Sequence, residues 1–145
     1  MQRRRNVLII LLGLGLLIAI TLLGSNLEAF LPQHPTAANQ VVQAGPYQIT
    51  LVVSPNPPHI TDPARLTIQI VKKNSNQLVT NATVVLENIM VSMDMGTGRV
   101  QARLQDDGTY LAHLPFTMSG TWQVRVLVTV PNTQTVSATF EVIAQ

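Results

Sequence analysis

Residues 47–54 read Tyr47-Gln48-Ile49-Thr50-Leu51-Val52-Val53-Ser54, and the next four are Pro55-Asn56-Pro57-Pro58. Every second side chain from the tyrosine onward is large and apolar, whereas most of those between are polar. A period of two is typical of a β-strand with one buried face, and β-branched residues favour that conformation. Because proline cannot donate to a β-ladder, the proline-rich run predicts the end of the strand.

The same alternation recurs through the rest of the chain. It predicts further strands over residues 66–71, 82–87, 99–104, 110–116, 122–130 and 136–143, with turn signals between them such as Asp106-Asp107-Gly108 and Pro131-Asn132. No window after residue 23 has the periodicity of a helix. Short strands at spacings of about ten residues are typical of an all-β sandwich. We therefore expect a seven-stranded immunoglobulin-like β-sandwich, with the single Trp122 in its core.

The N-terminus carries a different pattern, because Arg3-Arg4-Arg5 precede an apolar run from Val7 to Leu23. As a helix this run would span roughly 26 Å, near the lower limit for crossing a bilayer. Arginines on one side favour the cytoplasmic face. The sequence therefore predicts one N-terminal transmembrane helix in the cell membrane, with the C-terminal domain on the extracytoplasmic side and the lipid bilayer as a partner.

A cleaved signal peptide is the alternative, since it also has a basic start and an apolar stretch. Secretory apolar regions usually run about 7 to 15 residues, which is shorter than Val7–Leu23. No cleavage site of the A-x-A kind follows promptly in residues 24–29. These features favour a retained anchor and leave the signal peptide as the second interpretation.

The domain organisation follows from these segments. Residues 1–6 form a basic cytoplasmic stub, and residues 7–23 form the anchor. Residues 24–44 are expected to be a linker, because they hold proline and polar residues without apolar periodicity. Residues 45–145 form the folded domain.

Composition excludes several classes of function. The formal charge is +2 and becomes −1 without Arg3 to Arg5, so the outer domain offers no basic surface for nucleic acid. The chain contains no cysteine, which excludes disulfides and thiolate chemistry. The domain must therefore be held by its apolar core.

Methionines gather in one segment, Ile89-Met90-Val91-Ser92-Met93-Asp94-Met95-Gly96-Thr97-Gly98. In an extended chain Met93 and Met95 project to the same side, and Met90 projects to the other side unless the chain bends. Met118 and His113 belong to later segments and approach this one only through the fold.

Several short motifs occur in an order that resembles a known family. They are Gly45-Pro46-Tyr47, Val79-Thr80-Asn81-Ala82-Thr83-Val84, Met93-Asp94-Met95-Gly96, Gly108-Thr109-Tyr110 and Met118-Ser119-Gly120-Thr121-Trp122. Together they resemble the YtkA-like domain family, related to FixH-type proteins, over about residues 45–142. The resemblance implies an immunoglobulin-like sandwich behind an N-terminal anchor or signal. It also implies a link to copper or to respiratory oxidase assembly.

Copper binding gives the methionines a chemical role. Thioether sulfur is a soft ligand that suits Cu(I). On this hypothesis Met93 and Met95 are the principal ligands, and Met90, Met118 and His113 support them. The domain would bind or relay Cu(I) for oxidase assembly or copper homeostasis, with a membrane oxidase or copper transporter as partner.

A metal-free interaction module is the alternative. Methionines are flexible fillers of core gaps, and exposed ones often mark surfaces that bind partners. In that case the segment packs inward or forms an apolar docking edge. The position of the sulfurs in the fold separates the two hypotheses.

Catalysis finds no support in the sequence. There is no Gly-x-Ser-x-Gly, His-Glu-x-x-His or phosphate-binding loop. The position of Asp106 and Asp107 in a turn before Gly108 explains these two aspartates without a catalytic role. We therefore expect a binding protein and not an enzyme.

Overall fold

The computed structural model describes residues 36–94 and 96–145. The predicted anchor at 7–23, the basic stub and the first part of the predicted linker lie outside the described residues. Within the described ranges, no helix is long and apolar enough to cross a membrane.

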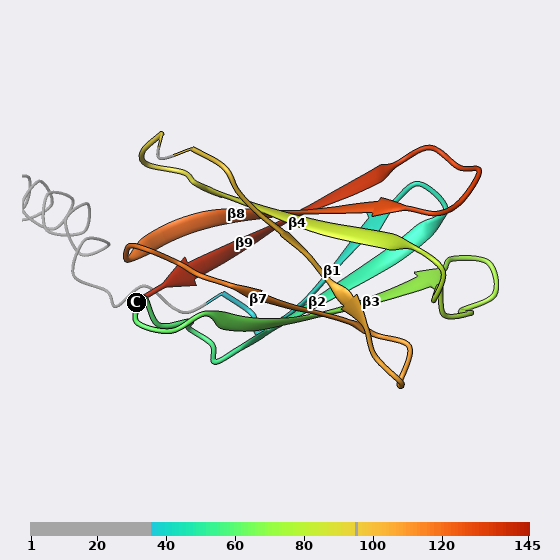
Figure 1. The fold of residues 1–145 in the computed structure, drawn as a ribbon, viewed down its shortest axis with the longest axis horizontal. Helices are drawn as coiled ribbons and strands as arrows, with labels where there is room; N and C mark the ends of the chain where they lie inside the picture. Colours follow the sequence, from blue (N-terminus) through green and yellow to red (C-terminus); the bar gives the residue numbers. More distant parts are fainter. Residues whose placement is uncertain (1–35, 95) are drawn as a thin grey trace, which may run out of the picture. The chain divides into compact units, whose positions relative to one another are not determined.

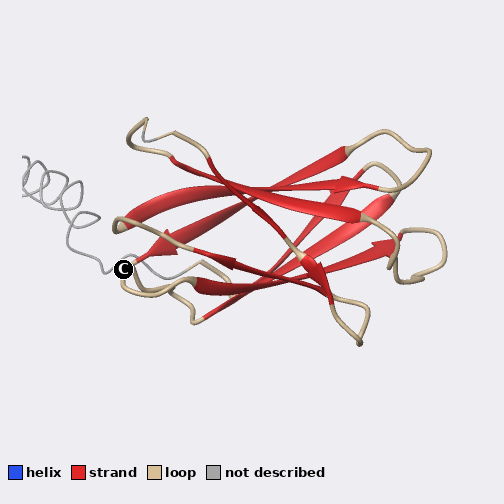
Figure 2. Ribbon diagram, in the orientation of Figure 1, coloured by secondary structure: helices blue, strands red, loops and turns tan. Residues whose placement is uncertain are grey.

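The described residues form two antiparallel sheets that face each other (Figures 1 and 2). One sheet has the strand order β1-β2-β3-β7-β6, and the other has the order β5-β4-β8-β9. The strands are β1 (Asn39–Ala44), β2 (Tyr47–Ser54), β3 (Ala64–Lys72), β4 (Thr83–Met90), β5 (Gly98–Gln101), β6 (Arg103–Leu104), β7 (Tyr110–Leu114), β8 (Gly120–Thr129) and β9 (Val136–Ala144). The prediction of an all-β sandwich is confirmed.

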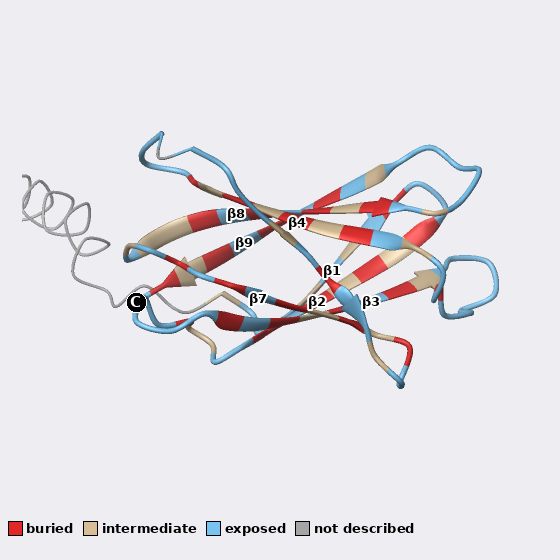
Figure 3. Ribbon diagram, in the orientation of Figure 1, coloured by how far each residue is buried: buried red, intermediate tan, exposed pale blue. Residues whose placement is uncertain are grey.

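The core lies between the two sheets. Along the strands buried residues alternate with exposed or partly exposed ones (Figure 3). The fully buried set includes Ile49, Leu51, Leu66, Ile68 and Ile70 from one sheet, and Val84, Leu86, Val124, Val126, Val128 and Val142 from the other. Trp122 is 4% exposed, as predicted, and packs edge-on against Phe116 with ring centroids 5.6 Å apart. Removal of this apolar surface from water is the main stabilising term of the fold.

The described residues form nine strands where the sequence predicted seven, and β1 is the first of the additions. It lies within residues 24–44, so the linker prediction is corrected for residues 39–44. Of its side chains only Ala44 is buried, which explains why its alternation is weak. Pairing with β2 through a tight turn forms the strand, and Gly45 takes the positive φ (57°) that the turn needs.

The second addition comes from the predicted strand 99–104, which divides into β5 and β6. The chain leaves the sheet of β5 and joins that of β6 at Ala102, whose N–H donates to the Val84 carbonyl at 2.9 Å. On the opposite side of the sandwich, the Gln40 amide donates to the Glu141 carbonyl at 2.6 Å and connects β1 with β9. The two sheets are therefore linked along both sides.

Loops from both sheets gather at one end of the sandwich. These are residues 55–63, 91–97 and 115–119, together with the end of β9, and we call this the methionine end (Figure 1). The register places them together, because Met90 pairs with Trp122 and Gly120 pairs with Ala144. Two hydrogen bonds between the 55–63 loop and Gln145 also connect the sheets here.

At the opposite end, Tyr110 ties β7 to the connection between β3 and β4. Its buried hydroxyl donates to the Val79 carbonyl at 3.0 Å and accepts from the Ala82 N–H at 3.0 Å. One side chain thus satisfies two backbone groups of an irregular segment.

Replacing Tyr110 by phenylalanine leaves both backbone groups without this partner. We expect the free energy of unfolding to fall by about 1–3 kcal/mol. Urea unfolding monitored by circular dichroism measures the loss. Tyr47→Phe removes a hydroxyl from the other tyrosine as a control, and an equal loss in both variants would contradict the role assigned to Tyr110.

The turn between β6 and β7 contains an aspartate that accepts two hydrogen bonds from Thr109, two residues further along the chain. The Thr109 hydroxyl and the Thr109 N–H donate to Asp107 Oδ1 at 2.7 and 2.9 Å. These bonds, the hydroxyl first, lower the pKa of Asp107 below its ordinary value of 3.8. They stabilise the ionised form of the carboxyl in the folded chain.

Because the pKa of Asp107 is lower in the folded state, its contribution to stability is complete above pH 3.8 and is lost as the pH falls through the lowered value. Asp107→Ala should therefore be less stable than wild type at pH 6, and the difference should shrink as the pH falls below 3.8. Thermal unfolding between pH 6 and pH 2 measures this, with Asp106→Ala as the neighbouring control. A difference that is constant over the whole range would contradict it.

Candidate functional site

Met90, the last residue of β4, is a core side chain. It is 5% exposed, and a Cβ added at Gly120 would lie 3.0 Å from the Met90 methyl carbon. The methionine therefore fills the space that the glycine leaves beside Trp122, its partner in register. This is the packing role that the sequence left open for the methionines.

Met93 differs, because it lies in the 91–97 loop and its side chain is 48% exposed. Core packing therefore does not explain it. Met95, the other principal ligand on the copper hypothesis, lies outside the described residues. Near the end of this loop the Gly96 N–H donates to Asp94 Oδ1 at 3.3 Å, and Gly96 has a positive φ of 79° that suits glycine.

Met118 comes from the 115–119 loop, between β7 and β8. It is half-buried against the core, and its carbonyl accepts a hydrogen bond from the Trp122 indole nitrogen at 3.0 Å. The fold thus brings Met90, Met93 and Met118 to the same end of the sandwich, although they belong to different segments.

His113 lies apart from this group. It projects from the outer side of β7, where it is exposed and opposite Arg65 in register. It borders a separate pocket of about 520 Å³ that also contains Arg103. Two positive side chains around this imidazole disfavour a cation there. The structure therefore does not place His113 with the methionines.

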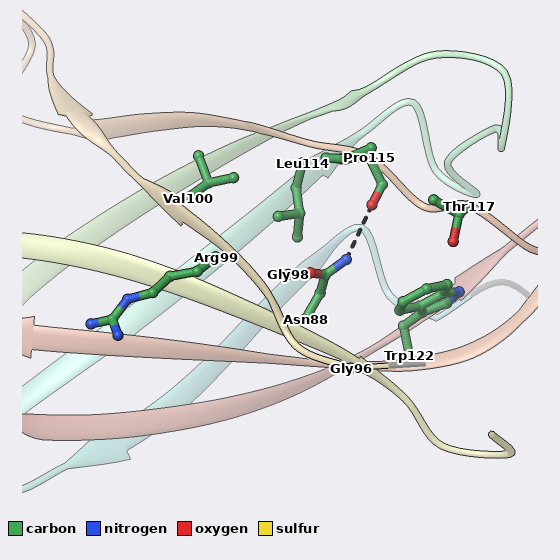
Figure 4. A pocket seen from close by; sticks show the side chains of 9 residues that line it. All are labelled: Asn88, Gly96, Gly98, Arg99, Val100, Leu114, Pro115, Thr117 and Trp122. Atoms are coloured by element: carbon green, nitrogen blue, oxygen red, sulfur yellow. Dashed lines mark hydrogen bonds between the residues drawn. The ribbon is translucent and has the colours of Figure 1, made fainter. Parts of the chain in front are cut away.

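A pocket of about 410 Å³ opens at the methionine end, between the 91–97 loop and the 115–119 loop. Figure 4 shows the side chains that line it. They are mostly apolar: Asn88, Gly96, Gly98, Arg99, Val100, Leu114, Pro115, Thr117 and Trp122.

Asn88 was not predicted as a site residue, yet among residues 36–94 and 96–145 it is the sole buried residue of the polar or charged type. It is 5% exposed and occupies an inward position of β4, in line with Val84, Leu86 and Met90. A signal for it was present in the sequence. The alternation of β4 places an amide where every neighbour on the same face is apolar.

The amide of Asn88 contacts both loops that border the pocket. Its Nδ2 donates to the Pro115 carbonyl at 3.1 Å, at the start of the 115–119 loop (Figure 4). Its Oδ1 is buried without a hydrogen-bond partner among the described residues and lies against Gly98, the partner of Asn88 in register. A Cβ at residue 98 would overlap this oxygen, so the asparagine requires glycine opposite it.

Gly98→Ala should therefore lower the free energy of unfolding by about 1–3 kcal/mol, because the Asn88 amide must shift to admit the new methyl group. In an Asn88→Ala background the same change should have much less effect, since the overlapping atoms are gone. A double-mutant cycle by urea unfolding measures the coupling. Additive effects would show that the two residues do not interact.

Ion pairs between charged side chains contribute little to the stability of the strands near this end. Glu87 lies on the outer face of its sheet, between Arg99 at 3.8 Å and Arg125 at 3.6 Å. Both arginines are exposed, and such pairs contribute about 0–1 kcal/mol. In the part of the chain that the structure describes, no three His, Asp or Glu side chains are grouped to hold a metal ion.

Comparison with known protein families matches residues 42–127 to the YtkA-like family. The match covers more than half of the chain, which therefore belongs to the YtkA-like family.

Among solved structures, FetP of uropathogenic E. coli strain F11, crystallised as isolated, is similar with a TM-score of 0.58 and 11% identity, over 77% of this chain and 97% of FetP. A copper-bound glutamate-to-glutamine variant of the same FetP is similar with a TM-score of 0.56 and 12% identity, over 76% of this chain and 90% of that one. At these identities the likeness shows the fold. No curated protein matches this chain.

Proposed function

We propose that this YtkA-like domain binds or relays Cu(I) through thioether sulfurs at its methionine end. The observation that carries the proposal is the position of Met93. It is 48% exposed on a loop, at the same end of the fold as Met118.

The chemistry of thioethers supports this function. Sulfur of methionine is a soft ligand and prefers Cu(I) to hard ions. It has no proton to lose, so its binding persists in acidic surroundings. Unlike a thiolate, a thioether is not lost to disulfide formation, which suits an oxidising compartment. The chain contains no cysteine that could serve as a soft ligand instead.

Met93 and Met95 are the principal ligands in this proposal, with Met118 as the third. Met90 takes a structural part, because its sulfur would have to leave the core to reach a metal. His113 has no part, since it borders a different pocket. The copper-bound FetP variant, which shares the fold, supports copper as the metal.

The proposal includes the place of the domain in the cell. The apolar run Val7–Leu23 anchors it to the membrane, with the folded part on the extracytoplasmic side. Tethering raises the effective concentration of the domain near membrane proteins. The partner in this proposal is a membrane oxidase or a copper transporter, and the role is binding or delivery of the ion without catalysis.

A second function, as a metal-free docking module, is favoured by one observation. Ile60, Val91 and Met93 are exposed by 44%, 57% and 48%, and all three lie in loops of the methionine end. Exposed apolar side chains that gather on one surface are typical of protein interaction sites.

An anaerobic Cu(I) titration of the full-length chain in detergent, against a chromophoric competing chelator, tests the first function. We expect one Cu(I) per chain in the wild type and loss of binding in the Met93→Leu/Met95→Leu variant. The double variant should lose no more than about 1.5 kcal/mol of stability, because leucine and methionine have similar volume.

Met90→Leu is the matched control, since it changes a methionine of the same segment that is buried. It should bind Cu(I) like the wild type. Failure of the wild type to compete with the chelator would exclude the copper function and leave the docking module.

A further inference from the structure

We infer that Asn88, together with Gly98, positions the two methionine-bearing loops relative to each other and so sets the metal affinity of the methionine end. This inference rests on the proposed copper function. It concerns a residue that binds no metal itself and acts through the loops that it holds.

Packing alone does not account for an asparagine at this position. Its surroundings in the core are apolar, and its Oδ1 has no hydrogen-bond partner among the described residues. An unpaired buried polar group costs about 1–3 kcal/mol. Leucine has nearly the same shape and would avoid that cost, so the amide is explained by what it contacts.

Asn88 fixes both ends of the 91–97 loop. It lies in β4, two residues before the strand ends at Met90. Gly98, which begins β5 where the loop ends, packs directly on the Asn88 amide oxygen. Because a side chain at residue 98 would separate these atoms, the close approach depends on glycine.

The 115–119 loop is held at two points by side chains from neighbouring strands. Asn88 of β4 donates to the Pro115 carbonyl at 3.1 Å, and Trp122 of β8 donates to the Met118 carbonyl at 3.0 Å. These strands are paired, and both side chains point between the sheets. The Trp122 bond orients Met118, whereas the Asn88 bond relates its loop to the loop of Met93.

The pocket between the loops gives this link its importance. A pocket of about 410 Å³ lies between the stem of the 91–97 loop and residues 115–117. Direct packing between the two loops therefore does not fix their spacing. Loss of the Asn88 bond would allow their spacing to vary, and ligands on the two loops would no longer be preorganised. Residues that orient metal ligands typically change the affinity by about 10–100-fold when they are mutated.

The test uses the full-length chain in detergent micelles with ¹³C-labelled methionine methyl groups, and Ag(I) as a redox-inert probe for thioethers. In the wild type, the Met93 and Met118 methyl resonances should shift together and saturate at one equivalent. In Asn88→Leu they should shift separately, and the Cu(I) affinity should fall by at least about tenfold. Leucine leaves no cavity, so the fold is expected to persist.

Val126→Ala is the matched control, because it removes buried apolar volume from the middle of β8, where Val126 lies opposite Leu86 and Ala138 in register. It should lower stability without changing the Cu(I) affinity or the joint shift of the two resonances. A similar loss of affinity in this control would overturn the positioning role.

The outcomes distinguish failure of the positioning role of Asn88 from failure of the proposed copper function. If the wild type shows no shift with Ag(I) and no binding of Cu(I), the copper function and the inference both fail. If the wild type responds and Asn88→Leu behaves identically, the inference alone fails. Should Asn88→Leu not fold, the Asn88 side-chain amide signals of the wild type decide, since they must shift when Ag(I) binds, and their constancy would overturn the inference.

Discussion

Apolar contact between the inner faces of the two sheets is the interaction on which the structure depends. The chain has no cysteine, so no disulfide assists this contact. Every strand except the short edge strands β5 and β6 contributes buried side chains, most of them at alternate positions. Since burial of apolar area is not directional, the detailed arrangement of the loops must come from specific polar contacts at the ends. Tyr110 supplies such contacts at one end, and Asn88 and Trp122 supply them at the methionine end.

The strands that could be predicted from the sequence are those in which apolar residues alternate with polar ones because every second side chain is buried. Ile49 and Leu51, or Val124 and Val126, face the core from the middle of their strands, and the pattern around them is unambiguous. β1 was missed because its pairing partner forms it, and its own side chains are mostly exposed. The division of 99–104 into β5 and β6 was also missed. The change of sheet at Ala102 leaves the alternation intact, and only the identity of the neighbouring strand changes.

The site could be predicted in composition but not in geometry. Sequence reasoning found the methionines because three occur close together, and it could not tell which are buried. The structure separates them, with Met90 in the core and Met93 exposed. His113 was grouped with them on its chemistry, whereas the pleat of β7 turns it to the outer face. The link from Asn88 to Pro115 joins residues distant in sequence, and no local pattern records it.

The way the two sheets end has a consequence for self-association. A long unpaired strand at the edge of a sheet can recruit the same strand of another molecule and start aggregation. In this fold β5 and β6 are short, because the chain changes sheets between them. β1 and β9 lie beside each other and are joined through Gln40. The same features that connect the sandwich along its sides therefore shorten two of the four sheet edges and place the other two beside each other, which works against an amyloid-like stack of chains.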